Sequence, residues 1–412
     1  MQRRVLLVHQ NFPGQYLHLA PALLRAGAQV TAVGMRELAP PAGVRYVRYR
    51  PQRSSSPGIH PWVGDFETKV IRGEACMQAL ATLKAEGYRP DLICAHPGWG
   101  EALFLKELWP DTPQLHYLEF FYGTQGLDAD FDPEFGPLLL PQRARLVAKN
   151  ANNLLNLHNM DAGVSPTHWQ HSTLPPLYQS RVEVIHDGID TTRFTPDRSV
   201  RLALKDDQGR EVTLSADTPL VTFVNRNLEP MRGFHTFMRA LPELMDRLPT
   251  ARVVVVGDAG VSYGAAPAEG SWKTRLLAEV GDRADASRLF FVGRVPHQQL
   301  TDLLRLSWAH VYLTYPFVLS WSMLEAMSLG AVVVGSDTAP VREVIQHGHN
   351  GWLVDFFDPS ALARRVAEVV TRPADQAPIR HAARQTVVER YDLRSRCLPA
   401  QMALLQRWLG AA

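Results

Sequence analysis

The segment from Phe317 to Asp337 carries residues whose types and spacing could bind an anion. Leu319-Ser-Trp-Ser322 leads into a short predicted helix, and a buried strand follows Gly330. The first amide N–H groups of a helix lack intrahelical partners and favour negative charge. Glu325, one turn in, could bond a hydroxyl attached to that anion, so a nucleoside diphosphate would fit. Ser322 and Glu325 equally match a capping box, which leaves both interpretations open.

Two arginines follow the first predicted strand of the second half of the chain. Arg226 and Arg232 flank a turn after Leu220–Asn225, and Gly233 leads from that turn into a predicted helix. Guanidinium groups at this point suit a diphosphate, because they offer charge-assisted and bidentate hydrogen bonds. Two exposed surface arginines are the alternative.

Polar residues also follow predicted strands in the first half. Gly14 permits close backbone approach after strand Val5–His9, although a G-x-G-x-x-G dinucleotide fingerprint is absent there. His96 ends strand Leu92–His96 and precedes a glycine-containing loop. Glu119, among aromatic residues after strand Gln114–Leu118, is either a perturbed carboxylate or pocket residue, or a member of a structural ion pair.

Metal chemistry has little support in the sequence. Asp128-Ala-Asp130 and Asp130-Phe-Asp132 match the Asp-x-Asp pattern of a magnesium-diphosphate clamp, but no apolar strand precedes them. The three cysteines are far apart and fit no metal spacing. We expect neither a metal nor another cofactor.

Short β-rich runs alternate with helical periodicity along the whole chain. This alternation predicts an α/β protein with two Rossmann-like, doubly wound domains, whose ligands bind beyond the carboxyl ends of the parallel strands in a cleft between them. The predicted domains are residues 1–195, 196–390 and a final helical segment, 391–412. The predicted elements of the second half include strands Arg252–Gly257, Leu289–Gly293, His310–Thr314 and Ala331–Gly335 and helices His235–Leu248, Arg275–Val280, Gln298–Ser307, Ser322–Leu329 and Ser360–Thr371.

The composition agrees with this architecture. A chain of 412 residues, 46% hydrophobic and 20% charged, is expected to form two globular domains, and a net charge of +2 argues against a nucleic-acid binder. The N-terminal apolar run is too short for a secretory signal, and no transmembrane run is present, so a cytoplasmic protein is expected. The basic, part-apolar helix Pro141–Lys149 indicates either peripheral contact with the inner membrane face or an ordinary solvated helix.

Together these residues resemble the family-four retaining glycosyltransferases, which have the two-Rossmann GT-B architecture. Arg226 and Arg232-Gly233 match that family's phosphate-contacting "Arg…Lys-Gly" pair, with Arg in place of Lys. Four further segments match in the family's order: Val184–Pro196, Phe291–Val295, Leu324–Asp337 and Asn350–Val354. In the Glu-x7-Glu motif, Glu325 is the second acid, whereas Phe317 occupies the position of the first.

The resemblance implies roles for individual residues. Arg226, Arg232 and Glu325 would contact the diphosphate and ribose of the donor, and His96 would lie near its sugar. Gly14 would face phosphate, and Val295 would present its backbone to the base. The other donor contacts would come from the loop before the helix: Leu319, Ser320, Trp321 and Ser322. The last helix, Ser395–Leu409, would cross back onto the first domain.

The expected activity is transfer of a sugar from a UDP- or GDP-sugar to an acceptor hydroxyl, with retained configuration and without a metal. The acceptor would be a carbohydrate, a lipid-linked molecule or another hydroxyl compound, as in polysaccharide, glycolipid or other glycoconjugate synthesis. Trp62, Glu119 and Tyr122 are the acceptor-side candidates. Two alternatives stay open: a GT-B sugar-nucleotide epimerase, and a non-catalytic nucleotide-sugar-binding subunit, which Phe317 favours.

Overall fold

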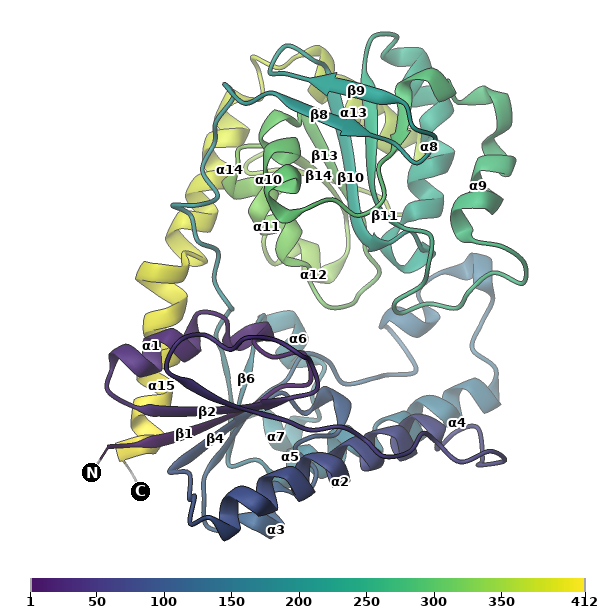
Figure 1. The fold of residues 1–412 in the computed structure, drawn as a ribbon. Coiled ribbons are helices and arrows are strands. Elements are labelled where there is room, and N and C mark those ends of the chain that lie inside the picture. The colour runs from purple at the N-terminus through teal and green to yellow at the C-terminus, as the bar shows by residue number, and fades with distance from the viewer. Residues whose placement is uncertain (1, 411–412) are drawn as a thin grey trace. The chain divides into compact units, whose positions relative to one another are not determined.

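The structure, a computed structural model, describes residues 2–410 (Figure 1). The chain divides into two compact units, Met1–Gly188 with Arg394–Ala412, and Ile189–Leu393. Each unit contains one parallel sheet with helices, which confirms the predicted α/β class with two Rossmann-like units. None of the helices in the described range is both long enough and apolar enough to cross a membrane.

The first unit is built on a seven-stranded parallel sheet. Side chains of Arg4–Val8 alternate between two apolar clusters: Val5 and Leu7 join one, while Leu6 and Val8 join the other. A strand buried on both faces is a continuous apolar run, which is why the sequence revealed it. In sheet order the strands are β3 (Val44–Arg48), β2 (Gln29–Gly34), β1 (Arg4–Val8), β4 (Leu92–Ala95), β5 (Gln114–Tyr117), β6 (Ala162–Ser165) and β7 (Val182–Val184).

Helices cover both faces of this sheet. The C-terminal helix α15 (Leu398–Gly410) packs beside α1 (Leu19–Arg25), where Leu404 and Leu405 join the cluster that contains Val5 and Leu7 (Figure 1). The remaining α-helices are α2 (Gly64–Ala85), α3 (Leu105–Leu108), α4 (Leu140–Lys149), α5 (Ala151–Asn159), α6 (His168–Ser172) and α7 (Pro176–Gln179). The 3-10 helices are η1 (Gly14–Tyr16), η2 (Pro97–Trp99), η3 (Asp128–Asp130) and η4 (Pro133–Phe135).

The second unit repeats the same strand order in a six-stranded parallel sheet. Its strands are β12 (Leu289–Phe291), β11 (Arg252–Asp258), β10 (Leu220–Asn227), β13 (Ala309–Tyr312), β14 (Val332–Ser336) and β15 (Trp352–Val354), and β8 (Leu202–Lys205) with β9 (Glu211–Leu214) forms a separate antiparallel hairpin. The α-helices are α8 (Phe234–Arg247), α9 (Trp272–Val280), α10 (His297–Leu306), α11 (Trp321–Ser328), α12 (Ala339–Arg342), α13 (Pro359–Thr371) and α14 (Ala377–Arg390). Short helices are η5 (Pro230–Arg232), η6 (Gly281–Arg283) and η7 (Ala286–Arg288). The π-helix η8 (Leu393–Cys397) begins at the last residue of this unit and continues into the first unit.

The boundaries between the units differ from the predicted ones at 195 and 390. The Ile189 N–H donates to the Tyr391 carbonyl at 2.8 Å, and the Leu393 N–H donates to the Ile189 carbonyl at 2.9 Å. Phe194 and Tyr391 are buried in the core of the second unit. Residues 189–195 and 391–393 therefore belong with the second unit, because their backbone and apolar side chains are satisfied there.

Candidate active site

A pocket of about 400 Å³ lies in the second unit. Strands β10 and β13 are sheet neighbours although they are not consecutive, and this switch in strand order is where α/β sheets bind ligands, beyond the strands' carboxyl ends. Polar and charged side chains predominate around the pocket, whose lining residues are Val224, Asn225, Arg226, Asn227, Glu229, Arg232, Val256, Tyr263, Arg294, Val295, Leu300, Ser320 and Ser322.

Arg226 reaches this pocket because the end of β10 is irregular. Val224 pairs with Val256 and Asn227 with Asp258, so β10 holds one more residue than β11 over this stretch. Such a bulge takes residues out of the ladder and redirects their side chains. Arg226 is exposed, and its guanidinium forms no ion pair or hydrogen bond with any residue in the described part of the chain. It is thus a cation available to a ligand.

Arg232 lines the same pocket but is buried and held in place. Its Nη1 donates to the Thr314 hydroxyl at 2.8 Å and to the Val318 carbonyl at 3.0 Å. Thr314 comes two residues after β13, and Val318 lies in the loop before α11. One guanidinium therefore connects η5 to the loop that leads into α11, and it presents a positioned positive charge to the pocket.

Hydroxyl groups mark the start of α11. Ser320 is the N-cap: its Oγ accepts from the Ser322 N–H at 3.4 Å and lies 2.9 Å from the Ser322 Oγ. The Ser320 N–H donates to the Tyr312 hydroxyl at 2.8 Å, which fixes the loop against β13. Ser320 and Ser322 both line the pocket, so a helix N-terminus with two hydroxyls faces the ligand space.

The capping box considered for Ser322 and Glu325 is wrong. The helix begins at Trp321 with Ser320 as its cap, two residues earlier than that box requires. The Glu325 carboxylate instead lies 3.5 Å from Nε2 of His297, the first residue of α10. Glu325 is nearly buried and is not among the pocket-lining residues, whereas Ser322, one turn before it, is.

Glu229 is a pocket residue that the sequence did not reveal. Its carboxylate, 1% exposed, accepts the backbone N–H groups of Ser262, Tyr263 and Gly264 at 2.9 to 3.2 Å. The loop after β11 is thereby held at the pocket, where Tyr263 contributes to the lining. The role of Glu229 in holding this loop is visible only from its hydrogen bonds to three consecutive backbone amides. No spacing of residues in the sequence predicts those bonds.

Phe317 is buried beside these residues rather than left open to solvent. Its ring centroid is 4.9 Å from that of Tyr263, and the Arg232 guanidinium carbon lies 5.6 Å from the Phe317 ring and 5.3 Å from the Tyr263 ring. Cation–π attraction contributes to such an arrangement. Phe317 therefore supplies an apolar aromatic wall behind the arginine.

The remaining predicted donor residues differ in position. Val295 lines the pocket. The side chain of Leu319 is buried in the core of the second unit, and Leu319 is not among the lining residues. Trp321 is 41% exposed at the first position of α11 and is not among the lining residues.

In the first unit, His9 and His96 meet at the equivalent switch point, after the neighbouring strands β1 and β4. Their ring centroids are 5.1 Å apart. The His9 Nδ1 accepts from the Asn11 N–H, so its Nε2 carries the proton and donates to Gln15 Oε1 at 2.6 Å. Gln15 in turn donates to Glu119 Oε1 at 3.1 Å.

His96 approaches the same carboxylate. Its Nδ1 accepts from the Gly98 N–H at 3.3 Å, which leaves the proton on Nε2, 3.4 Å from Glu119 Oε2. That contact lacks hydrogen-bond geometry, so Nε2 is a buried donor with no hydrogen bond among residues 2–410. Trp99 stacks on the His96 ring at 4.3 Å and restricts its orientation. The structure thus brings His96 and Glu119 together with His9. His9 directly follows β1, but it was not selected from the sequence as a site residue.

Burial and neighbouring charge shape this group. Burial, with repulsion from His96, lowers the pKa of His9 to about 3, so His9 is neutral near pH 7. Gly14 has φ +46°, and a Cβ there would come within 2.2 Å of His9 Nε2. Only glycine therefore lets the chain pass this ring.

The other two acceptor-side candidates, Tyr122 and Trp62, have separate partners within the first unit. The Tyr122 backbone bonds the Asn150 side chain in both directions, at 2.7 and 3.1 Å. Trp62 precedes α2 and packs edge-on against His60, with 5.1 Å between ring centroids. Within residues 2–410 the ring contact of Trp62 is with His60, and no hydrogen bond or ring contact described for Trp62 joins it to Glu119 or Tyr122.

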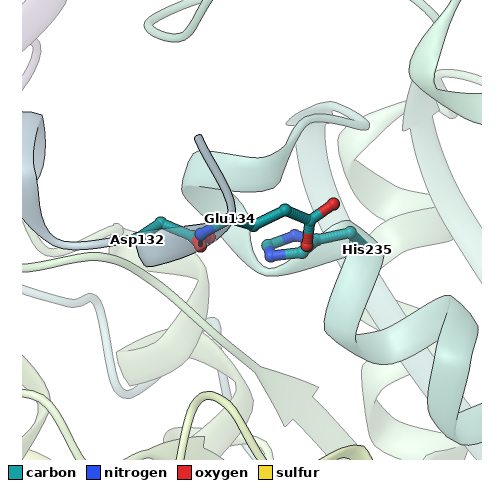
Figure 2. Close-up of side chains that lie close together, drawn as sticks. All are labelled: Asp132, Glu134 and His235. Atoms are coloured by element: carbon teal, nitrogen blue, oxygen red, sulfur yellow. Dashed lines mark hydrogen bonds between the residues drawn. The ribbon is translucent and has the colours of Figure 1, made fainter. Parts of the chain in front are cut away.

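Three potential metal ligands are drawn in Figure 2: Asp132, Glu134 and His235. Asp132 and Glu134 come from the start of η4 in the first unit, and His235 comes from the first turn of α8 in the second. The three are therefore not the ligand set of either unit. Asp130, from the Asp-x-Asp pattern, accepts from the Gly126 N–H at 3.1 Å and stabilises its own loop.

Comparison with known proteins decides the family. Residues 26–194 match Glycosyl transferase family 4 group, and residues 205–386 match Glycosyl transferases group 1. Over 353 residues the chain is 30% identical to D-inositol 3-phosphate glycosyltransferase of Streptomyces avermitilis, covering 81% of this chain and 71% of that protein. The chain belongs to the group 1 glycosyltransferases.

Other members and solved structures agree with this assignment. The corresponding protein of Corynebacterium jeikeium is 26% identical over 303 residues, which cover 71% of this chain and 66% of that relative. Sucrose-phosphate synthase from Thermosynechococcus elongatus matches with a TM-score of 0.72 at 20% identity, over 100% of both chains. HepE from Anabaena, in complex with UDP and glucose, matches with a TM-score of 0.66 at 16% identity, over 98% of this chain and 100% of HepE. At such identities the likeness establishes the fold, which is GT-B.

Proposed function

We propose that this group 1 glycosyltransferase moves a sugar from a nucleoside diphosphate to an acceptor hydroxyl with retained anomeric configuration. One observation carries the donor assignment: unpaired Arg226, buried Arg232 and the hydroxyl-bearing start of α11 surround a single pocket. Two guanidinium groups and a helix N-terminus together match the charge of a diphosphate. The binding of UDP by HepE supports a nucleotide ligand for this fold.

Arg226 and Arg232 would act when the bond from the sugar to the diphosphate breaks. Negative charge then grows on the departing oxygen, and positioned cations stabilise that charge more than they stabilise the substrate. The acceptor oxygen bonds to the anomeric carbon on the face that the diphosphate leaves, and its proton passes to the departing phosphate oxygen. No protein nucleophile or metal enters this scheme.

The remaining groups would orient substrates. Val295 would meet the base, and Glu325, now paired with His297, would exchange that partner for ribose hydroxyls. In the first unit, the unbonded His96 Nε2–H would donate to a sugar hydroxyl, and Glu119 would accept from the acceptor hydroxyl. Trp62 and Tyr122 would supply aromatic contact to that acceptor.

The experiment is a donor screen followed by a turnover assay. UDP- and GDP-sugars are first tested for thermal stabilisation of the protein, because a ligand that binds only the folded state raises Tm. The stabilising donor is then incubated with sugar, polyol and lipid-linked acceptors, including D-inositol 3-phosphate, the acceptor in its relatives' name. Nucleoside diphosphate release and the configuration of the product are measured.

The outcomes separate the candidate functions. Glycosylated product with retained configuration is the expected result, and EDTA should not change its rate. An epimerised or free sugar without acceptor product would establish the epimerase alternative. Stabilisation without any release of nucleotide would establish a binding subunit, the alternative that the aromatic wall at Phe317 favours.

A further inference from the structure

Helices α4 and α5 carry an exposed apolar stripe in the first unit. Leu140, Val147 and Leu154 are seven residues apart and are 78%, 67% and 44% exposed. Residues at this spacing lie on one side of a helix, which places Leu140 and Val147 together on α4. Leu154 lies on α5, which begins directly after Asn150, the C-cap residue of α4. Both helices are labelled in Figure 1. No residue of α4 is buried, so folding of the unit does not use this helix as a core element.

The charge on the same segment has one sign. No Asp or Glu occurs between Glu134 and Asp161, whereas Arg143 and Arg145 project from α4 and are exposed. Neither arginine forms an ion pair or hydrogen bond with a residue in the range 2–410. A solvated helix ordinarily mixes both signs, so this segment combines apolar exposure with unneutralised positive charge.

The side of α5 opposite the stripe packs against the rest of the first unit and holds the stripe in place. The opposite side of α5 buries Asn152, Asn156 and Leu157, and Asn152 donates to the Pro97 carbonyl in the loop after His96 at 3.0 Å. Asn150, at the junction of the two helices, holds the backbone of Tyr122. The exposed face is therefore tied directly to the loops that carry the acceptor-side residues.

We propose that the α4–α5 stripe docks on the surface of an anionic lipid bilayer. An interfacial helix places apolar side chains at the acyl boundary, while its cations meet anionic headgroups. Leu139 at 64% exposed and Leu155 at 46% extend the apolar contact. A second copy of the chain is a poorer occupant, because pairing two such faces would bring arginines together with no acid to neutralise them. Docking of this stripe does not depend on which donor the second unit binds.

The test is co-sedimentation of the full chain with sucrose-loaded vesicles. We expect binding to phosphatidylcholine vesicles that contain phosphatidylglycerol, little binding to pure phosphatidylcholine, and release at high salt. Each cation near such a surface contributes about 1 kcal/mol, or about fivefold in affinity, so the double change Arg143→Gln with Arg145→Gln should weaken binding roughly 25-fold. Leu140→Glu with Val147→Glu should abolish it.

Matched variants control for general effects of the substitutions. Leu177→Glu alters a leucine that is 79% exposed on α7, and Arg89→Gln removes an exposed arginine outside the stripe. Both should bind vesicles as the wild type does, and circular dichroism should show that every variant is folded. Equal loss in stripe and control variants, equal binding to neutral vesicles, or no vesicle binding would overturn the proposal. A stripe variant that dissociates a dimer without changing vesicle binding would assign the face to a second copy instead.

Discussion

Replacing Arg226 by alanine tests the donor pocket most directly, because this arginine has no structural task. It is exposed on the bulge of β10 and forms no hydrogen bond or ion pair within residues 2–410. Removing it should therefore change the free energy of unfolding by no more than about 0.5 kcal/mol. Arg232 would be a less clean choice, since its bonds to Thr314 and Val318 also hold the loop before α11.

The effect on turnover should be much larger than the effect on stability. If Arg226 stabilises the charge that develops on the departing diphosphate, its loss removes one oxyanion contact, about 2.7–4 kcal/mol or roughly 100- to 1000-fold in kcat. Because the contact strengthens as charge develops, kcat should fall more than KM rises. Arg226→Lys should recover part of the rate, since it restores charge but not a bidentate contact.

The assay measures steady-state release of nucleoside diphosphate, with urea unfolding on the same preparations. Arg201→Ala is the matched control, because Arg201 is also exposed in the second unit and lies outside the pocket. A kcat/KM for Arg226→Ala within about threefold of the wild-type value would refute the assignment, because one lost oxyanion contact exceeds that by more than tenfold. A large loss of stability would refute the inference that Arg226 faces only the ligand space.

Three further results are expected. Glu229→Ala should raise the donor KM about tenfold, the worth of one charge-assisted hydrogen bond of about 1.5 kcal/mol, and should remove hydrogen-exchange protection at Ser262–Gly264; retained protection would contradict the clamp. Gly14→Ala should destabilise the first unit by about 1–3 kcal/mol through its contact with His9, and more than Gly126→Ala, which has a similar φ but open space, as measured by urea unfolding. Burial lowers the pKa of His116 to about 3 and that of His310 to about 4, so below pH 6.5 the unfolded chain binds protons that the folded chain does not, and stability should decline as pH falls from 6.5 towards 4. His310→Asn should make that decline shallower, and an unchanged slope would assign it to other groups.

Whether a helix or strand could be predicted from the sequence depended on how much of it is buried in the core. Buried parallel strands such as β11 (Arg252–Asp258) are continuous apolar runs, so the sequence located them. Helix α14 escaped notice because it buries only Ile379, Ala383 and Val387, a narrow stripe at four-residue spacing. The hairpin of β8 and β9 and the strand β15 were missed because none of them is a fully buried apolar run like β12: β8 and β9 bury only alternate residues, and β15 buries only Val354.

The candidate site shows the same division. Arg226 and Arg232 could be selected because each follows a strand that the apolar pattern reveals, and strand ends are where such sheets bind ligands. His9 could have been selected by the same rule, since it directly follows β1. Glu229 could not, because its three amide partners lie 33 to 35 residues away and only the folded loop brings them to its carboxylate.

The amino-acid sequence by itself determined the two α/β units, the family and the residue types at the strand ends, because each is recorded in local periodicity or in motif order. Tertiary structure alone decided which of those residues are held and which are available to a ligand. It bonds Arg232 to Thr314 but leaves Arg226 without a partner among residues 2–410. It also places Glu325 beside His297 rather than in a helix cap, and it packs Phe317 against Tyr263. The two residues of each of these pairs are far apart along the chain, so they come into contact only when separate helices, strands and loops pack together.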